Sequence, residues 1–343
     1  VFTFCGKGNN AGDGYLVANL ANEVGLESFV IQISKQGNLS RPSSKALKIS
    51  RSSGVKFITL KSFTKMSLNK AVLVDALLGT GVKGNVRKNI SDVIKVINQK
   101  SIHYPVLSID IPSGICADTG EELGTAIKAN LTTTFIGRKR GCYTSSGRSN
   151  SGTIEFSDLG IKKTTTNKVV SNCYILDMEK SLAKILNRPK NSHKGDFGHT
   201  LIVGGDSGYG GAAILASKAA IMSGSGLVSL ATKKEHVSAA LSSCPELMVN
   251  KVNSGQDLEE LLAKPDTIVI GPGLGQSAWS EQMLQKTFIE AKKRNLPVVM
   301  DADALNLLSK LKLASGTPKK LVITPHPGEA AKLLKRPVET IQR

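Results

Sequence analysis

Short apolar runs of strand type alternate with segments of helical periodicity along most of this chain. The runs of the first 160 residues are VFTF, ESFVIQIS, KFITL, AVLVDALLG, YPVLSIDIP, ANLTTTFIG and GTIEFSDLGI. Between the first two lies YLVANLANEVG, which is apolar at helical spacing and ends in a glycine. Strands interleaved with helices are typical of a parallel sheet covered on both faces, so we expect a Rossmann-like three-layer α/β domain.

A second series of the same kind begins near residue 191. Its strand-like runs are TLIVGG, GLVSLAT, DTIVIGPGLG, LPVVMDADAL and KLVITPHPGE, and AAILASKAAIMSGSG and AWSEQMLQKTFIEAKKRN have helical character. The polar stretch IKKTTTNKVVSN separates the two series and has little to bury. We therefore predict a first domain at 1–165, a linker at 166–190 and a second α/β domain at 191–343. The second domain has different motifs and is not a repeat of the first.

Composition limits the classes to which the protein can belong. Hydrophobic residues make up 40% and charged residues 21%, and no apolar run approaches the ~18 residues of a membrane-spanning helix. The five cysteines are far apart and form no CxxC pair, which favours a reducing, cytoplasmic setting over a disulfide framework or a cysteine metal site. The net charge of +18 could attract a polyanion. However, the lysines are scattered without interleaved aromatic residues, so we expect a small-molecule ligand rather than nucleic acid.

The loop after the first strand, CGKGNNAGDG, combines glycines with polar side chains. Gly6, Gly8 and Ala11 fit the start of a dinucleotide-binding fingerprint, which places a pyrophosphate on a helix N-terminus. That fingerprint also needs an acidic residue at the end of the next strand to hold the ribose. Here the strand runs into Ser34 and Lys35. An ordinary NAD-dependent dehydrogenase is therefore disfavoured, and the asparagines and aspartate of the loop need another explanation.

Two further strands of the first domain end in polar side chains. Asp75 precedes the glycine loop 79–85, and Asp110 is followed closely by Ser113. The carboxyl ends of neighbouring parallel strands face one crevice. Asn10, Asp75 and Ser113 could therefore converge as oxygen ligands of a hard cation, which leaves Asp110 as an acid or base. Each of these residues could instead cap a following helix, but three such loops in one domain make capping alone a poor explanation.

In this order, GKGNNAGDG, VDALLGTG and IDIPSG resemble the NAD(P)HX epimerase domain of bifunctional NAD(P)H-hydrate repair enzymes. The resemblance spans nearly all of residues 1–160, with Ala11 where the family usually has glycine. It implies that Asp110 is the catalytic residue, which holds the hydrated nicotinamide and promotes epimerisation of the R form to the S form. It also implies a potassium ion bound by Asn10, Asp75 and Ser113. The implied substrate-binding residues, besides Asp110, are Asn9, Asn10, Ala11, Gly12, Asp13, Gly79, Thr80, Gly81, Val82, Lys83, Gly84 and Asn85.

Loops rich in glycine and acidic residues also follow the strands of the second domain. GGDSGYGGAA bends into a helix, and GPGLG allows a close approach of the backbone to a ligand, although either could be only a tight turn. In DADALN, Asp303 and Asn306 could face a ligand or cap a helix. His326 lies between two prolines in TPHPGE. A strand-end loop is a poor place for a core histidine, so this position favours ligand contact.

Together these motifs resemble the ADP/ATP-dependent NAD(P)HX dehydratase domain of the same enzymes, which has a ribokinase-like fold. The resemblance implies that Ala212, Gly273 and His326 contact the hydrated substrate. It implies ADP or ATP with magnesium as the phosphoryl donor for the added hydroxyl, whose loss as phosphate regenerates NAD(P)H. The family's Lys-Gly nucleotide loop and Gly-x-Gly-Asp turn do not occur between His326 and Arg343, and the family's segment before VFTF is missing. We therefore expect an internal fragment of a longer protein, with an incomplete ribokinase-like domain and an inactive dehydratase.

Two other interpretations fit part of the sequence. One is a ribokinase-type kinase for a vitamin or sugar, fused to a nucleotide-binding module, but the extended match of the first domain argues against it. The other is a non-catalytic module whose basic surface recruits nucleic acid or a protein. The sequence favours a homo-oligomeric metabolite-repair enzyme that acts on hydrated NADH and NADPH.

Overall fold

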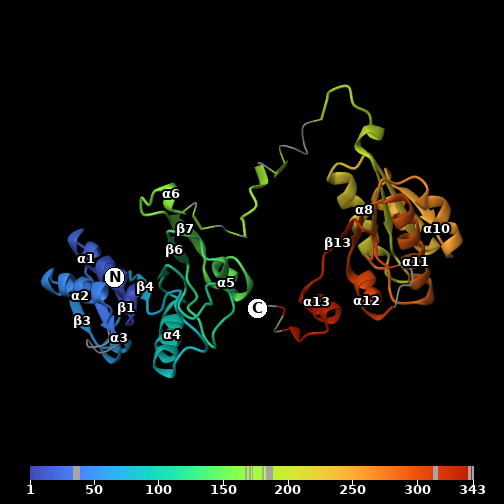
Figure 1. Cartoon of the computed structure of the whole chain (residues 1–343). Helices are drawn as coiled ribbons and strands as arrows, with labels where there is room; N and C mark the ends of the chain where they lie inside the picture. Colours follow the sequence, from blue (N-terminus) through green and yellow to red (C-terminus); the bar gives the residue numbers. More distant parts are fainter. Residues whose placement is uncertain are drawn as a thin grey trace. The chain divides into compact units, whose positions relative to one another are not determined.

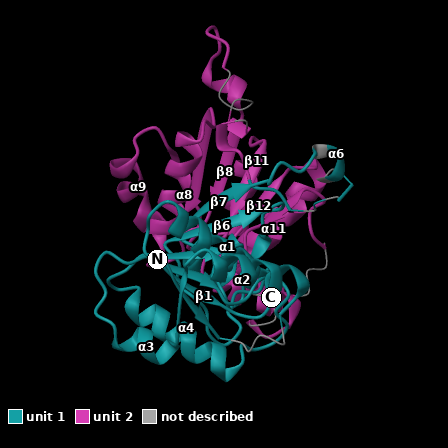
Figure 2. Cartoon of the chain, turned by 90° about the vertical axis from the view of Figure 1, so that its left-hand side faces the viewer, with its two compact units in different colours: residues 1–175, 342–343 teal, residues 176–341 magenta. Residues whose placement is uncertain are grey.

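The computed structural model of this 343-residue chain describes residues 1–33, 39–166, 168–169, 171, 173–179, 181–182, 188–311, 316–338 and 341. The chain divides into two compact units, which we call unit 1 (residues 1–175) and unit 2 (residues 176–341), drawn in teal and magenta in Figure 2. The division falls inside the predicted linker 166–190, part of which lies outside the described residues. Ser34 and Lys35 also lie outside them. The exact domain boundaries stay a prediction.

Unit 1 contains a seven-stranded parallel sheet in the order β3-β2-β1-β4-β5-β6-β7 (Figure 1). The strands are β1 (Phe2–Cys5), β2 (Phe29–Gln32), β3 (Lys56–Ile58), β4 (Leu73–Ala76), β5 (Val106–Ile109), β6 (Leu131–Phe135) and β7 (Thr153–Ser157). Strand order reverses between β1 and β4, which pair directly. In open α/β sheets this reversal opens a crevice at the carboxyl ends of the strands, where ligands bind.

Helices cover both faces of this sheet because successive side chains of each strand point to opposite sides. Phe2 and Phe4 of β1 pack with α3 (Leu60–Lys65) and α4 (Lys88–Lys100). Cys5 instead packs with α1 (Asn9–Glu23) and α2 (Arg41–Ser52). The described residues of the unit also form three short helices: η2 (Arg140–Cys142), α5 (Ser145–Asn150) and α6 (Lys163–Thr166). Unit 1 thus has the three layers that the sequence predicts.

Unit 2 contains a six-stranded parallel sheet in the order β10-β9-β8-β11-β12-β13. The strands are β8 (His199–Val203), β9 (Leu227–Thr232), β10 (Met248–Lys251), β11 (Thr267–Ile270), β12 (Val298–Met300) and β13 (Leu321–Ile323). Here the order reverses between β8 and β11, so this unit has the same kind of crevice as unit 1. The edge strand β10 has no counterpart among the predicted runs, since its residues MVNK form no apolar stretch.

The helices of unit 2 also lie on both faces of its sheet. One face packs with α8 (Gly210–Met222) and α9 (Val237–Ser243). The other packs with α10 (Gly255–Leu262), α11 (Ala278–Arg294) and α12 (Ala302–Lys310). The remaining helices are η3 (Lys194–Phe197), η4 (Lys234–His236) and α13 (Pro327–Leu334). The predicted fold class, two α/β units with parallel sheets, is confirmed. No helix within the described ranges has both the length and the apolar character needed to cross a membrane.

Candidate functional site

The β1–α1 loop of unit 1 is pressed against the end of β4. A Cβ added to Gly6 would lie 1.9 Å from the carbonyl oxygen of Leu77, and one added to Gly14 would lie 2.4 Å from the Ala76 methyl. Only glycine allows this approach without moving the helix from the sheet. As a result, α1 begins beside the loop that follows β4, and Asn10 Nδ2 donates a hydrogen bond of 2.8 Å to the Leu78 carbonyl.

Asp75 organises the next part of this site. It is fully buried at the end of β4, and its carboxylate accepts hydrogen bonds from Ser108 Oγ (2.9 Å), Ser113 N (2.8 Å), Ser113 Oγ (2.6 Å) and Leu77 N (3.2 Å). Ser113 Oγ also accepts from Leu78 N at 2.8 Å. Neither Asp75 nor Ser113 caps a described helix, because α4 begins at Lys88, well beyond Asp75. The capping alternative is therefore wrong for both residues.

One oxygen in this network has no partner. Asn10 is buried, its amide nitrogen is used, and its Oδ1 accepts no hydrogen bond within the described part of the chain. An unpartnered buried acceptor is rare and needs an explanation such as a bound ion or water. Burial raises the pKa of Asp75, although hydrogen bonds from Ser113, Leu77 and Ser108 oppose this. A nearby cation would favour the charged form of this carboxylate.

Asp110 lies at the end of β5 in a strained conformation. Its φ is +70°, a left-handed value that non-glycine residues seldom adopt. Its Oδ1 accepts hydrogen bonds from Phe135 N (3.3 Å) and Thr134 Oγ1 (3.5 Å) and forms an ion pair with Lys139 Nζ. The Asp110 side chain is 19% exposed and that of Lys139 is 17% exposed. The carboxylate is therefore fixed from one side and still partly open.

The helix start contributes further predicted residues to the same region. Partial burial, followed by the charge of Asp110, raises the pKa of Asp13, so the two carboxylates lie within electrostatic reach. Asn9 is exposed, and its Oδ1 accepts a hydrogen bond of 2.7 Å from Ser40 Oγ. Ala11 and Gly12 are buried, and a Cβ on Gly12 would lie 2.9 Å from Ser43 Oγ. Ala11 and Gly12 therefore can offer a ligand little more than backbone.

A cavity of about 630 Å³ opens beside the β4–α4 loop. It is lined by Lys7, Ile33, Leu77, Leu78, Gly81, Val82, Lys83, Asn85, Val86, Arg87, Asn89 and Ile90. Four residues of the predicted substrate loop, at 81–83 and 85, are among them, and Gly79 packs beside Asn10. Lys7, Lys83 and Arg87 make the lining cationic, which suits a phosphate-bearing ligand. Asp110 is not among the lining residues, so the cavity and the acidic side chains lie at different parts of the site.

In unit 2 hydrogen bonds join the loop after β8 to the segment after β11. Asp206 N donates to the Gly273 carbonyl at 2.8 Å, and the Asp206 carboxylate accepts from Ser277 Oγ at 2.6 Å. Gly273 has φ +61°, and a Cβ there would lie 2.1 Å from the Tyr209 carbonyl oxygen. Tyr209 immediately precedes α8, whose first turn carries the exposed Ala212. Two of the three predicted dehydratase residues thus lie on neighbouring segments, Gly273 in the loop after β11 and Ala212 in the first turn of α8.

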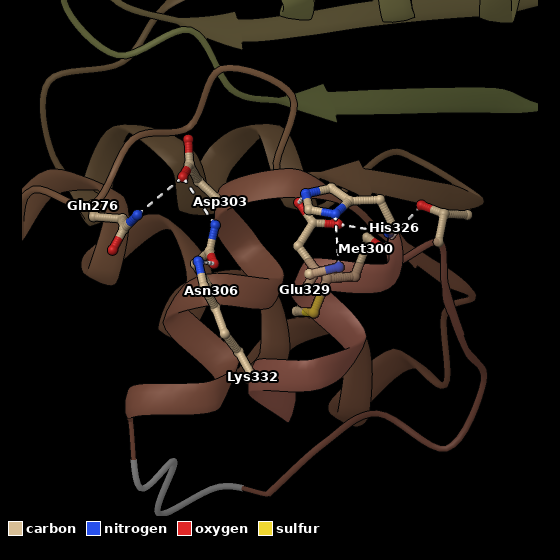
Figure 3. A network of polar contacts seen from close by, with 9 residues as sticks. Gln276, Met300, Asp303, Asn306, His326, Glu329 and Lys332 are labelled. Atoms are coloured by element: carbon tan, nitrogen blue, oxygen red, sulfur yellow. Dashed lines mark hydrogen bonds and ion pairs between the residues drawn. The ribbon is translucent and has the colours of Figure 1, made fainter. Parts of the chain in front are cut away.

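Asp303 holds the other end of the GPGLG loop. Its carboxylate accepts from Gly275 N (3.1 Å), Gln276 Nε2 (3.2 Å) and Asn306 Nδ2 (3.4 Å), and Asn306 Oδ1 accepts from Lys332 Nζ (3.0 Å), as Figure 3 shows. The sequence leaves open whether Asp303 and Asn306 face a ligand or cap a helix. Neither is the N-cap of α12, which is Asp301. In this structure they tie the loop to two helices.

His326 is both a helix cap and an exposed side chain. Its Nδ1 accepts from Gly328 N at 3.1 Å, and Glu329 Oε1 lies 3.3 Å from its Nε2 (Figure 3). The imidazole remains 68% exposed. It stands between β13 and α13, and no contact within the described residues joins it to Ala212 or Gly273. The histidine is therefore available to a ligand, but the free protein does not hold it against the other two predicted residues.

Comparison with known proteins shows the family of the chain. A family model described as YjeF-related protein N-terminus matches residues 1–141, and one described as NAD(P)H-hydrate dehydratase matches residues 200–343. The bifunctional NAD(P)H-hydrate repair enzyme Nnr of Coxiella burnetii is 39% identical over 340 residues, which cover 99% of this chain and 67% of that protein. This chain belongs to the family of bifunctional NAD(P)H-hydrate repair enzymes. Membership decides against the vitamin or sugar kinase.

A second relative and one solved structure are also similar to parts of this chain. The repair enzyme Nnr of Escherichia coli K12 is 38% identical over 330 residues, covering 96% of this chain and 62% of that protein. The chain thus spans about two-thirds of the length of these relatives. The ADP/ATP-dependent NAD(P)H-hydrate dehydratase from Bacillus subtilis, co-crystallised with ATP and Mg²⁺, is 28% identical with a TM-score of 0.39, covering 48% of this chain and 57% of that one.

Sequence reasoning missed Lys139 as a residue of the unit 1 site, and it also missed Ser108 beside Asp75 and the cavity residues Lys7 and Arg87. In the sequence Lys139 stands in the basic triplet Arg138-Lys139-Arg140, which looks like solvated surface. In the structure Arg138 and Arg140 are exposed, whereas Lys139 turns inward to Asp110. A lysine among arginines gives no signal of this by itself. The signal would have to come from the strand end before it, which faces the same crevice as Asp110.

Proposed function

We propose that unit 1 interconverts the R and S forms of hydrated NADH and NADPH. The observation that carries this proposal is the set of buried oxygens of Asn10, Asp75 and Ser113 beside the strained Asp110, at the point where strand order reverses. Inversion of the carbon that bears the added hydroxyl by opening its C–N bond removes the hydroxyl proton, and inversion by opening its C–O bond adds a proton to that oxygen, so either path moves a proton at the hydroxyl oxygen. A partly enclosed carboxylate such as that of Asp110 suits this transfer.

The remaining unit 1 residues are proposed to bind the dinucleotide. Backbone groups at the start of α1 and in the loop 79–85 can approach phosphates closely, since glycines leave both loops open. The cavity beside the second loop supplies three cationic side chains, Lys7, Lys83 and Arg87. We assign the nicotinamide end of the substrate to the Asp110 side and the phosphate-bearing part to the α1 start and the cavity.

We further propose that Asn10, Asp75 and Ser113 hold a potassium ion. The residues fit such an ion because the amide oxygen of Asn10 is buried without a partner and a buried carboxylate lies in the same network. Oxygen donors of this kind suit a hard cation. The proposed ligands are a mixed set of amide, hydroxyl and carboxylate oxygens, from Asn10, Ser113 and Asp75. The ion would order the loop after β4 and offset the charge of Asp75.

For unit 2 we propose a share in the dehydration of the S form. Ala212 in the first turn of α8 and Gly273 in the loop after β11, with the exposed His326, would contact the hydrated nicotinamide. By family resemblance the phosphoryl donor is ADP or ATP with magnesium, and electrostatic stabilisation of the transferring group is the main catalytic contribution. The relatives are about half as long again as this chain, so this reaction is proposed for the whole protein. A homo-oligomeric state stays a prediction.

The test uses the hydrated dinucleotide directly. Purified chain is incubated with R-NADHX, and its conversion to the S form is followed by chromatography against the spontaneous rate. We expect conversion well above that rate, its loss in Asp110→Asn with an unchanged melting temperature, and a lower rate when potassium is replaced by N-methylglucamine. Conversion at the spontaneous rate would refute the epimerase and leave the non-catalytic module. An epimerase indifferent to potassium would refute the ion alone.

A further inference from the structure

We infer that Lys139 is a positioning residue of the epimerase site, which acts through Asp110. This inference rests on the proposed function of unit 1. Lys139 Nζ contacts two acceptors at once, the carboxylate of Asp110 and the carbonyl oxygen of Phe135 at 2.8 Å. Because Phe135 N also donates to Asp110 Oδ1, the ammonium, the carboxylate and the end of β6 form one closed arrangement.

The backbone around this ion pair is strained on both sides. Asp110 has φ +70° and Ile136 has φ +67°. For a β-branched residue such as Ile136 the left-handed region is a true outlier. Strain of this kind persists only where the surroundings over-determine it, and it collects at functional sites. The two residues of positive φ, Asp110 directly after β5 and Ile136 directly after β6, bring the Asp110 carboxylate and the Lys139 ammonium together.

The backbone of Lys139 is also fixed independently of its side chain. Its carbonyl accepts from Cys142 N at 3.0 Å, and η2 begins at the next residue. Its neighbours show that the inward direction is specific to this residue. Arg138 is exposed and reaches Tyr143 and the Phe156 ring, and Arg140 reaches the Asp118 carbonyl. Of these three adjacent cations, only Lys139 therefore turns its side chain inward.

The charges around Asp110 indicate the role of the Lys139 ammonium. Asp13 and Asp110 interact as like charges, and Lys139 is the cation that contacts Asp110. Without Lys139, the Asp110 carboxylate would keep the like charge of Asp13 within electrostatic reach and would lose the ammonium that fixes its direction. A carboxylate that moves a proton at a hydroxyl oxygen must stay within hydrogen-bond reach of it. We therefore assign to Lys139 the orientation of Asp110 toward the substrate.

The experiment compares Lys139→Ala, Lys139→Arg and Arg138→Ala with the wild-type chain in the R-to-S assay. We expect Lys139→Ala to lower kcat by about 10²-fold, the lower end of what a misplaced acid–base group loses, with KM changed less than about threefold. Lys139→Arg should regain most of kcat because it keeps a charged donor. Arg138→Ala, which removes a cation from the same turn, should retain wild-type kinetics.

Addition of ethylamine separates positioning from a purely structural role. A small ammonium can enter the space left in Lys139→Ala and restore kcat in a saturable way, whereas it cannot restore Asp110→Asn. Lys139→Ala with wild-type kcat would overturn the inference. So would a loss of kcat that neither arginine nor ethylamine relieves and that follows a lowered melting temperature. An inactive wild-type chain would instead show that the proposed function has failed.

Discussion

Replacement of Asp75 by asparagine tests whether one carboxylate holds the oxygen network of unit 1 together. All four groups that contact this carboxylate are hydrogen-bond donors, and two of them are backbone N–H groups, those of Leu77 and Ser113. Asparagine has nearly the same shape but only one acceptor oxygen. Its amide nitrogen must therefore face a donor in either orientation, at a fully buried position.

The size of the effect follows from which donors can turn away. The hydroxyl of Ser113 can rotate to the Leu78 carbonyl, 3.2 Å away, but a backbone N–H cannot rotate. One buried N–H therefore loses its acceptor in either orientation, at about 1–3 kcal/mol. The contact between the new amide nitrogen and a hydrogen-bond donor adds to this cost. Part of the cost is offset because asparagine carries no charge that must be buried. We expect a net loss of about 1–3 kcal/mol, or roughly 3–10 °C in the melting temperature of a unit of this size.

The assay is differential scanning calorimetry of the chain, with the transition of unit 1 followed in sodium and in potassium buffers. Asp92→Asn is the matched control, since Asp92 is exposed on α4 and its loss should change stability by less than about 0.5 kcal/mol. If potassium binds the folded state, it raises the melting temperature of the wild type but not of Asp75→Asn. Equal melting of Asp75→Asn and wild type in sodium would show that the carboxylate does not hold this network.

Four further substitutions test the packing and the charges. Gly14→Ala should cost about 1–3 kcal/mol in chemical denaturation, since its Cβ would lie 2.4 Å from a β4 side chain, whereas Gly8→Ala, with nothing within 4 Å, should be close to neutral. Burial and the Asp110 charge raise the pKa of Asp13, so the folded state binds this proton more tightly than the unfolded state. Its contribution to stability is therefore present below an unfolded pKa of about 3.9 and is lost as pH rises through the folded pKa. Asp13→Asn should remove this slope from a stability curve between pH 3 and 6; an unchanged slope would contradict the assignment. Gly273→Ala, at φ +61° and with its Cβ 2.1 Å from a backbone oxygen before α8, should lower the melting temperature of unit 2.

Residues at the ends of strands were predictable from the sequence. A short apolar run with a polar residue directly after it marks both the strand and the edge that it faces. Parallel pairing then brings such ends together, as for Asp75 and Ser113. The same rule located Asp303, although the sequence left open whether it would face a ligand, and the structure uses it to anchor the GPGLG loop. Strand positions can be inferred locally, whereas the partner of a side chain depends on tertiary contacts.

Three features could not be predicted from the sequence, and the first depends on a contact between distant parts of the chain. Lys139 reaches Asp110 across 29 residues of sequence because the turn after β6 adopts a left-handed conformation at Ile136, which no propensity rule assigns to isoleucine. The capping role of His326 was hidden by the two prolines, which suggested only a rigid loop. Edge strand β10 was missed because a half-exposed strand needs no apolar run.

The two units share two structural features at equivalent places in their sheets: a residue of positive φ after a strand and a carboxylate that fixes a loop. β5 and β12 are each the second strand beyond the strand that opens the unit's glycine loop, and each is followed by a non-glycine residue of positive φ, Asp110 at +70° and Ala302 at +48°. In each unit a carboxylate then fixes a loop at the sheet edge by accepting a hydrogen bond from a backbone N–H. Asp75 accepts from Leu77 N in unit 1, and Asp303 accepts from Gly275 N in unit 2. A loop that is already fixed loses little conformational entropy when a ligand arrives. The strain and these two carboxylates therefore act before binding, and they leave the binding energy of the dinucleotide available for the reaction itself.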